Sequence, residues 1–258
     1  MVRRGAFSRH IGRDASFVDL SIATFWHPED EYRITHPVPG GDECTVLRFS
    51  SDLLRAALDA LQVTGSDASV VRFPSPEVRM PVAGVVLERI AFCGSRRGDL
   101  MALEIEELSF DFLAAALRAS RRLLSGGEPE RFHSRGSHEY VMRVREVIAR
   151  DFRSRLTLPC IAERVGCSPF HLSRIVRAVE AVSIHRMLME FRLRYAVGCL
   201  LETPASISEI ALLCGFSSQS HFGAVFRREF GMSPARFRRH PRSTGRRPQA
   251  NRVWLARA

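Results

Sequence analysis

The sequence contains no lysine, so each of its 38 fixed positive side chains is an arginine guanidinium group. It has six cysteines but no Cys-x-x-Cys pair, no His-x-His pair and no cysteine–histidine cluster at the spacing of a zinc site. We therefore expect no metal, no cofactor and no catalytic residue. The cysteines should be reduced thiols that pack as small apolar groups; they are Cys44, Cys93, Cys160, Cys167, Cys199 and Cys214.

Long apolar runs are also missing. No uninterrupted run approaches the roughly 20 residues that cross a bilayer. Arg3, Arg4 and Arg9 are not followed by the apolar stretch of about 7–15 residues that a secretory signal needs. We therefore expect a cytoplasmic protein with no membrane partner.

The net charge of +10 is unevenly placed along the 258 residues. Residues 131–258 hold 23 arginines and 9 acidic residues, a balance of +14, whereas residues 1–130 hold 15 and 19, a balance of −4. A strongly basic half suits a polyanion, because each phosphate contact releases counterions from a DNA duplex.

The first half reads as strands followed by a helical hairpin, which favours an α+β domain. Ser50 or Ser51 is expected to cap the first helix, and a proline-broken segment covers residues 73–81. A loop is predicted at residues 94–98, inside the hairpin. The predicted strands are residues 16–26, 32–36 and 44–49, and the predicted helices are residues 52–61, 82–92 and 99–124.

A polar segment rich in glycine and proline lies where the charge changes sign, and it is the best domain boundary. Beyond it the pattern is helical, with Ser137 as a cap for residues 139–152 and a long helix over residues 183–201. The predicted division is a sensor or dimerisation domain over 1–124, a linker over 125–137, an all-helical domain over 138–240 and a basic disordered tail over 241–258.

Two segments around the long helix look like copies of one another. The element Ile-Ala-x-x-x-Gly-x-Ser occurs at residues 161–168 and again at 210–217, an offset of 49. The apolar positions Leu172 and Ile175 recur as Phe222 and Val225 at an offset of 50, so the second copy has one extra turn residue.

The residue type at each position of the element has a structural explanation. Ala162 and Ala211 leave room for a closely crossing helix, and Gly166 and Gly215 suit the left-handed position that ends a helix. A serine then caps the next helix, with Pro169 in its first turn in copy one, and copy two opens with the capping box Ser206-x-x-Glu209. Each copy therefore predicts a helix-turn-helix unit, the arrangement that places its second helix in the major groove.

The spacing of the copies also fits DNA. A helix of 19 residues is about 28 Å long, and one turn of B-DNA is about 34 Å. Such a helix, with a unit at each end, could present two recognition helices to successive major-groove segments.

Residues 138–240 resemble the DNA-binding domain of the AraC/XylS family of bacterial transcription regulators. The resemblance is carried by the segments 192–196, 200–201, 215–222, 226–228 and 231–238. It implies a sequence-specific regulator, with double-stranded DNA and RNA polymerase as partners and a nucleoid-associated location. The family often has glycine where Ala181 stands and aspartate where Ser218 stands, so we expect an altered turn at the first and a retained cap at the second.

The second helix of each copy supplies the predicted DNA contacts. Arg174 is the preferred candidate for a bidentate contact to guanine, and Phe170 could pack on a thymine methyl group or be a satellite core residue. Arg227 and Arg228 are assigned to phosphates, and Ala224 is too short for polar readout. Any one of these arginines could instead be a solvated surface charge. The predicted contacts are Ser168, Pro169, Phe170, His171, Ser173, Arg174 and Arg177 in copy one and Ser218, Gln219, Ser220, His221, Ala224, Arg227 and Arg228 in copy two.

Residues 1–124 are similar to the cupin-like sensor domain of many family members, and residues 31–44 carry that weaker resemblance. It implies a β barrel with a helical hairpin on one side. Trp26, Tyr32 and His36 could line a pocket for a small-molecule effector, or could simply fill the barrel core. The helix over residues 99–124 could serve a homodimer interface, since its apolar stripe must be covered.

Two other classes of protein are compatible with parts of the pattern. An enzyme with an appended DNA-binding domain, such as a DNA-repair alkyl transferase, would need a reactive cysteine, and no cysteine here stands in a catalytic setting. An architectural protein that coats DNA would need only charge, whereas two capped recognition helices indicate sequence reading.

Overall fold

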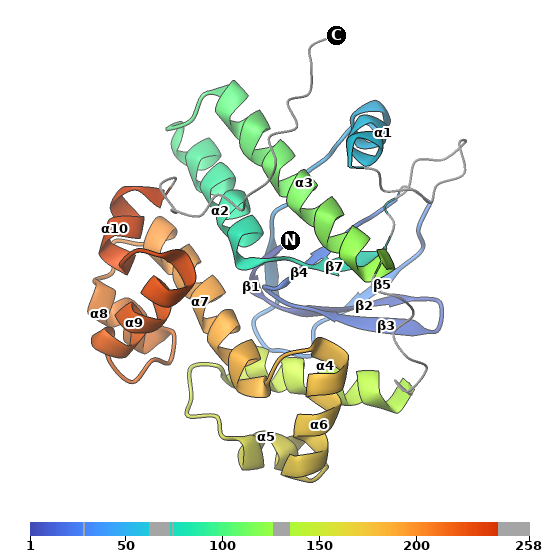
Figure 1. Ribbon diagram of the computed structural model, residues 1–258, viewed down its shortest axis with the longest axis vertical. Helices are drawn as coiled ribbons and strands as arrows, with labels where there is room; N and C mark the ends of the chain where they lie inside the picture. Colours follow the sequence, from blue (N-terminus) through green and yellow to red (C-terminus); the bar gives the residue numbers. More distant parts are fainter. Residues whose placement is uncertain (28, 62–72, 74, 126–134, 242–258) are drawn as a thin grey trace.

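The computed structural model describes the whole chain except residues 28, 62–72, 74, 126–134 and 242–258 (Figure 1). The predicted tail, apart from Pro241, and most of the predicted linker lie outside the described residues. The strands are β1 (Val2–Gly5), β2 (Phe7–Ile11), β3 (Asp14–Val18), β4 (Ile22–Thr24), β5 (Arg33–Thr35), β6 (Asp42–Cys44) and β7 (Glu77–Arg79). The helices are α1 (Ser51–Ala60), α2 (Val82–Arg97), α3 (Ala102–Ser125), α4 (Arg135–Asp151), α5 (Leu158–Val165), α6 (Pro169–Glu180), α7 (Ile184–Glu202), α8 (Ile207–Leu213), α9 (Gln219–Phe230) and α10 (Pro234–Arg239).

The described strands form three small antiparallel sheets. β1 pairs with β6, β2 lies between β3 and β5, and β4 pairs with β7. None of these sheets closes on itself within the described part of the chain, so the predicted cupin-like barrel is not confirmed. The coarser prediction holds, because the chain combines a mixed strand-and-helix half with an all-helical half.

The strand predictions were partly wrong in their boundaries. The predicted strand over residues 16–26 is broken into β3 and β4 by a turn, in which the Asp19 carboxylate accepts hydrogen bonds from the backbone and hydroxyl of Ser21 at 2.7 and 2.6 Å. Residues 2–11 form β1 and β2, which were not predicted. Of the predicted strand over residues 44–49, only Cys44 belongs to a strand.

The helical hairpin is longer than predicted. α1 is capped by Ser50 as expected. α2 runs through the predicted loop and ends at Gly98, which takes the left-handed conformation. The loop prediction failed because Gly94 serves close packing: a Cβ there would lie 2.2 Å from the Leu100 side chain. On α3, Phe112 and Ala116 are buried beside β7 and α2, so most of the apolar stripe is covered by this same chain.

The C-terminal half is built around α7, which runs between two small groups of helices (Figure 1). α4, α5 and α6 lie around one end of α7, and α8, α9 and α10 lie around the other. α4 begins at Arg135, so Ser137 lies inside its first turn rather than capping it. One apolar cluster continues from the strands of the first half into both groups of helices.

The two halves of the chain pack against each other along α7. Arg97 of α2 donates to the carbonyl oxygen of Leu201, and Arg4 of β1 pairs with Glu202 at 3.2 Å. In the described part of the chain, no helix is both long and apolar enough to cross a membrane.

Candidate nucleic-acid interface

The first predicted helix-turn-helix unit is present as α5, a tight turn and α6. Gly166 ends α5 in the left-handed conformation with φ +81°, and its N–H donates to the Ala162 carbonyl oxygen at 2.9 Å. Ser168 caps α6 by accepting from the His171 N–H at 3.3 Å, and Pro169 opens the helix. Ala162 is 1% exposed, which agrees with its predicted place beneath the crossing helix.

The second unit repeats this arrangement with the extra turn residue. Ser206 and Glu209 form the predicted capping box on α8. Gly215 has φ +77°, and Phe216 N–H donates to the Ala211 carbonyl oxygen at 2.9 Å. Ser218 caps α9 in the way predicted for it, and it accepts from His221 N–H at 3.1 Å.

Aromatic packing and two arginines hold the units to α7. Phe222 and Phe226 of α9 are fully buried, and their rings pack edge to face. The ring of Phe237 in α10 packs edge to face on Phe226 in the same way. Arg192 donates to the carbonyl oxygens of Phe152 and Ser154 at 2.8 and 2.9 Å. Burial lowers the pKa of Arg192 from its usual value. The two carbonyl oxygens, which lie just after α4, accept hydrogen bonds from its buried guanidinium group.

Arg238 plays a similar part at the C-terminal end of α7. Its side chain donates to the carbonyl oxygens of Leu200 and Ala205 at 3.2 and 2.6 Å. No role was predicted from the sequence for Arg192 or Arg238. Both lie in the segments that carry the family resemblance, which was the available signal, but periodicity could not show that their guanidinium groups turn inward.

α6 presents the side chains that were predicted to meet DNA. Leu172 and Val176 are fully buried, whereas Pro169, Phe170, Arg174 and Arg177 are exposed. Phe170 is 74% exposed, so the alternative of a satellite core residue is wrong. The Arg174 guanidinium carbon lies 5.8 Å from the centre of the Phe170 ring, within range of a cation–π contact.

α9 has a different outer surface. Gln219, Ser220 and Ala224 are exposed at its start and along its outer face. They border a shallow hollow of about 350 Å³ that is shared with Arg227 and with the first residues of α10. Gly223, which has no side chain, and the small Ala224 are among the residues that line it.

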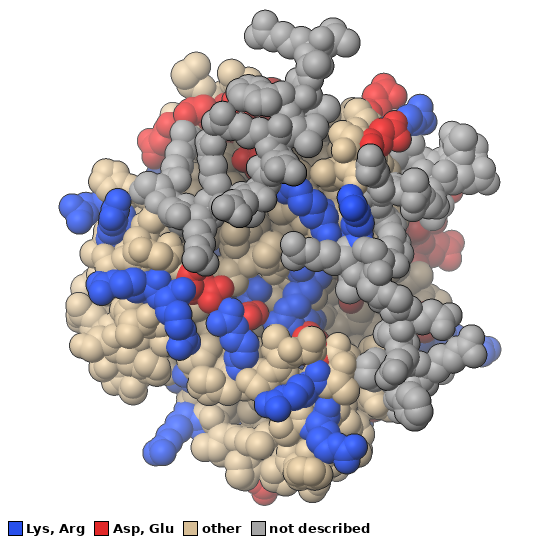
Figure 2. Space-filling model, viewed as in Figure 1, with Lys and Arg blue, Asp and Glu red and all other residues tan. Residues whose placement is uncertain are grey.

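In the described part of the chain, the arginines exposed on α6 and α9 lack the carboxylate partners that many arginines in the interior of the protein have. Among the described residues, no carboxylate lies within salt-bridge distance of four of them, Arg174, Arg177, Arg227 and Arg228. Figure 2 shows arginine side chains spread over the area of α6, α7 and α9, with few acidic side chains among them. Unpaired guanidinium groups on exposed helix faces are suited to phosphates and base edges.

The turn after α6 was expected to be altered, but it takes the left-handed conformation although alanine stands there. Ala181 ends α6 with φ +56°, and it is the one described residue other than glycine with a positive φ. Replacing Ala181 with glycine should raise the free energy of unfolding by about 0.5–1 kcal/mol, because a Cβ is disfavoured in this conformation.

Urea denaturation with an unchanged slope would measure the effect of Ala181→Gly. The matched control is Ala178→Gly, which places glycine at an exposed position inside α6 and should cost about 1 kcal/mol. A loss of stability in Ala181→Gly would contradict the interpretation of the turn.

The effector residues are only partly brought together. The rings of Trp26 and Tyr32 are in contact, with centroids 4.3 Å apart. His36 Nε2 instead lies 2.6 Å from a carboxylate oxygen of Asp42. The described residues include no group of three or more His, Cys, Asp or Glu side chains placed to hold a metal ion, and the six cysteines are free thiols.

Comparison with known proteins agrees with this geometry. A helix-turn-helix domain family matches residues 161–240. The chain is 34% identical over 161 residues to the HTH-type transcriptional regulator GlxA of Rhizobium meliloti, covering 58% of this chain and 49% of GlxA. It is 36% identical over 83 residues to the Proteus vulgaris protein named "Probable transcription factor PqrA", covering 32% of this chain and 68% of that protein.

A third relative bears on the enzymatic alternative. The Bifunctional transcriptional activator/DNA repair enzyme AdaA of Bacillus subtilis is 29% identical over 100 residues, which cover 39% of this chain and 47% of AdaA. The chain spans about half the length of the first curated relatives it matches.

The fold and these matches first define a class, proteins with two helix-turn-helix units joined by one long helix. Within that class, this chain belongs to the AraC/XylS family of transcriptional regulators, as the motifs at residues 192–238 indicated.

Proposed function

We propose that this protein is a sequence-specific, DNA-binding transcription regulator. The observation that carries the proposal is the pair of capped recognition helices, α6 and α9, at opposite ends of α7, each with exposed arginines that have no carboxylate partner among the described residues. Reading two separate segments of one duplex requires two such helices on a rigid connection, whereas charge alone would be enough for coating DNA.

Within this proposal the two units have different tasks. α6 reads base edges, with Arg174 directed to a guanine and the exposed Phe170 to a neighbouring thymine methyl group. His171, Ser173 and Arg177 are placed at the groove or the backbone beside them. α9 reads less sequence than α6, because Ala224 offers no polar group to a base. Base edges are within reach of the residues that begin α9: Gln219, Ser220 and His221. Arg227 and Arg228 bind phosphates.

In vitro selection from a random duplex library tests the function, because no operator needs to be known beforehand. We expect the full chain to enrich a site with two conserved elements about one helical turn apart. Binding to that site should be at least about a thousandfold tighter than binding to a scrambled duplex at equal salt. Equal affinity for both duplexes, with no enriched motif, would identify a coating protein and reject the proposal.

The enzymatic alternative receives less support. The curated relatives are named as transcriptional regulators, and AdaA is matched over less than half its length. Burial raises the pKa of the Cys93 and Cys167 thiols and, together with Asp42, raises that of Cys44 to about 12. These three thiols hold little thiolate at neutral pH, whereas an alkyl-accepting cysteine needs it. Cys199 differs from them, because a hydrogen bond with Cys214 lowers the pKa of its thiol.

The first half, residues 1–124, is proposed as a cupin-like sensor or dimerisation domain, followed by the linker 125–137, the DNA-binding domain 138–240 and the basic tail 241–258. The contact of Trp26 with Tyr32 supports a small-molecule effector at that place, with His36 at its edge. A transcription regulator of this kind would work in the cytoplasm, on the nucleoid, and would contact RNA polymerase at the promoter.

The outer face of α3 supports a homodimer. Leu103 and Phe110 are 61% and 44% exposed. Exposed Glu106 and Glu107 lie between them, and exposed Asp111, Arg118 and Arg121 follow. An antiparallel copy of α3 with Phe110 opposite Ala114 would set Glu106 of each copy opposite Arg118 of the other.

A further inference from the structure

A chain of ion pairs begins at the last residue of the first recognition helix. Glu180 ends α6, and one of its carboxylate oxygens lies 3.1 Å from Arg145 Nε of α4. Its other oxygen accepts from Arg79 of β7, which belongs to the first half of the chain. A carboxylate at a helix C-terminus faces the negative end of the helix dipole, so it is stable there only with cations beside it.

The chain continues to the middle of α7. The second arm of the Arg79 guanidinium donates to Glu190 at 3.0 Å. Glu190 also accepts from Arg194 at 3.1 Å and from Arg186 at 2.7 Å. The planar fork of Arg79 thus joins two carboxylates on different helices, which a single ammonium group could not reproduce.

The last link reaches the second recognition helix. Arg186 donates through its other arm to Glu229 at 2.9 Å, and Glu229 lies in the last turn of α9. The connection therefore runs without a break from Glu180 through Arg79, Glu190 and Arg186 to Glu229. It joins the C-terminal ends of α6 and α9, and its central cation comes from the first half of the chain.

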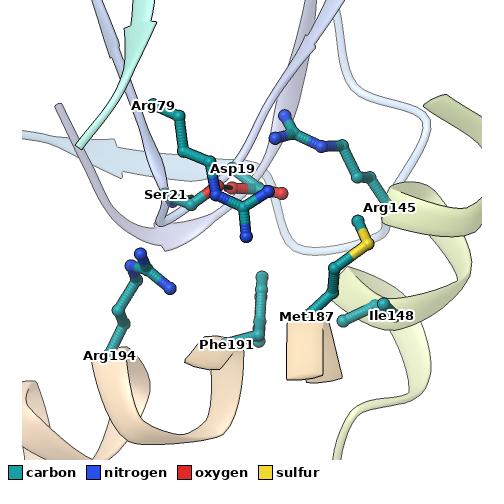
Figure 3. Close-up of a pocket in the computed structure, with 8 residues that line it drawn as sticks. All are labelled: Asp19, Ser21, Arg79, Arg145, Ile148, Met187, Phe191 and Arg194. Carbon is teal, nitrogen blue, oxygen red and sulfur yellow. Dashed lines mark hydrogen bonds between the residues drawn. The ribbon is translucent and has the colours of Figure 1, made fainter. Parts of the chain in front are cut away.

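The carboxylates at the centre of this chain are largely shielded from solvent, whereas Arg186, the link to α9, is 41% exposed. The side chains of Glu180 and Glu190 are 12% and 11% exposed, and that of Arg79 is 28% exposed. Figure 3 shows Arg79, Arg145 and Arg194 converging from β7, α4 and α7 on a small cavity beside Asp19 and Ser21. Arg194 donates in addition to the carbonyl oxygen of Met80 at 3.1 Å, which connects the residue directly after β7 to α7.

Glu190 stays ionised over the physiological range. Burial alone would raise its pKa, but Arg194, Arg79 and Arg186 lower it to about 2. Because the pKa is depressed in the folded state, the stabilisation is present above the ordinary value of 4.5 and is lost only as the pH falls toward 2.

We infer that this ion-pair chain fixes the position of α6 relative to α9, and that Arg79 is a positioning residue through which the first half of the protein sets the spacing of the DNA elements read. The part that concerns DNA rests on the proposed function, whereas the part that concerns helix positions does not. Any signal that displaces β7 would reach both recognition helices at their ends.

Arg79→Ala is expected to fold, because neither carboxylate loses all its partners. Glu180 keeps Arg145, and Glu190 keeps Arg186 and Arg194. Arg33→Ala is the matched control: it removes one charge from an exposed position on β5, and no carboxylate partner of Arg33 is found in the described part of the chain. Arg79→Lys is the conservative variant.

The first measurement needs no DNA. Spin labels are attached at positions 178 and 224, which are exposed on α6 and α9, through introduced unnatural amino acids rather than cysteines. Double electron–electron resonance then measures the distance between the two helices. We expect one narrow distribution in the wild type and in Arg33→Ala, a broader one in Arg79→Ala and in Arg186→Ala, and an intermediate one in Arg79→Lys. An unchanged distribution in Arg79→Ala would overturn the inference, whether or not the protein proves to be a regulator.

The second measurement uses the selected duplex with one base pair inserted or removed between its two elements. The wild type should discriminate against the altered spacing by about tenfold, and Arg79→Ala should reduce that discrimination to about twofold, a change of the size common for coupled sites. An equal loss of affinity on every spacing would instead show a purely structural role for Arg79 and would also overturn the inference. If the wild type selects no site at all, the proposed function fails, and the distance measurement still decides the role of Arg79.

Discussion

Replacing Arg174 with alanine should weaken binding to the selected site by about 5- to 150-fold while hardly changing binding to a scrambled duplex. A bidentate arginine–guanine contact contributes about 1–3 kcal/mol of discrimination, and that contact is absent on the wrong sequence. Arg174 is exposed on α6, and the Phe170 ring beside it restricts where its guanidinium group can point. Fluorescence anisotropy titrations on both duplexes at one salt concentration measure the two losses.

Arg227→Ala provides the matched control on α9, since it also removes one exposed arginine without a carboxylate partner among the described residues. A phosphate contact carries no sequence information, so binding to both duplexes should fall alike. The slope of log K against log salt should become shallower by about one. Equal losses on both duplexes for Arg174→Ala would remove its role as a base reader.

Replacing Gly215 with alanine should destabilise the protein by about 3 kcal/mol or more. The residue has φ +77°, and a Cβ there would lie 2.6 Å from the Phe152 carbonyl oxygen and 2.9 Å from the Arg153 Cα. These are backbone atoms, and Arg192 donates a hydrogen bond to the Phe152 carbonyl oxygen. Moving them to make room for a Cβ would therefore be energetically costly. The strain of the left-handed conformation adds to the overpacking.

Gly166→Ala separates the two causes. Gly166 has φ +81°, but among the described residues no neighbouring atom would lie within 4 Å of a Cβ added there. Gly166→Ala should therefore lower the free energy of unfolding only by the cost of the left-handed conformation, about 1 kcal/mol. Urea denaturation of both variants gives the comparison, and similar losses at the two glycines would show that the close approach at Gly215 has no energetic weight.

The helical half could be predicted from sequence because its signals are local. A capping serine, a glycine in the left-handed position and apolar residues on one face act within a few residues. They predicted the end of α5, the starts of α6, α8 and α9, and both ends of α7 to within a residue or so. The strand half depends on pairing between distant segments, such as β1 with β6 and β4 with β7. Alternation in the sequence does not specify such partners, which is why β1 and β2 were not predicted and the barrel was not confirmed.

The candidate site was predictable to a similar extent. Helical periodicity separated the inward Leu172 and Val176 from the outward Phe170 and Arg174. It could not assign a partner to any arginine, because Arg79 lies about a hundred residues from Glu180 in the sequence. The arginines that hold the fold and those left exposed look the same in the sequence, and only tertiary contacts distinguish them.

The rigid α7 helix between the two units also constrains how such a chain can change in length. One extra residue inside α7 would rotate everything beyond it by about 100° and advance it by about 1.5 Å. α9 would then point away from the duplex that α6 engages. Under the proposed function, insertions and deletions should therefore be tolerated in the turns around the units and excluded from α7 itself, because the length of α7 sets which spacing of DNA elements the protein could bind.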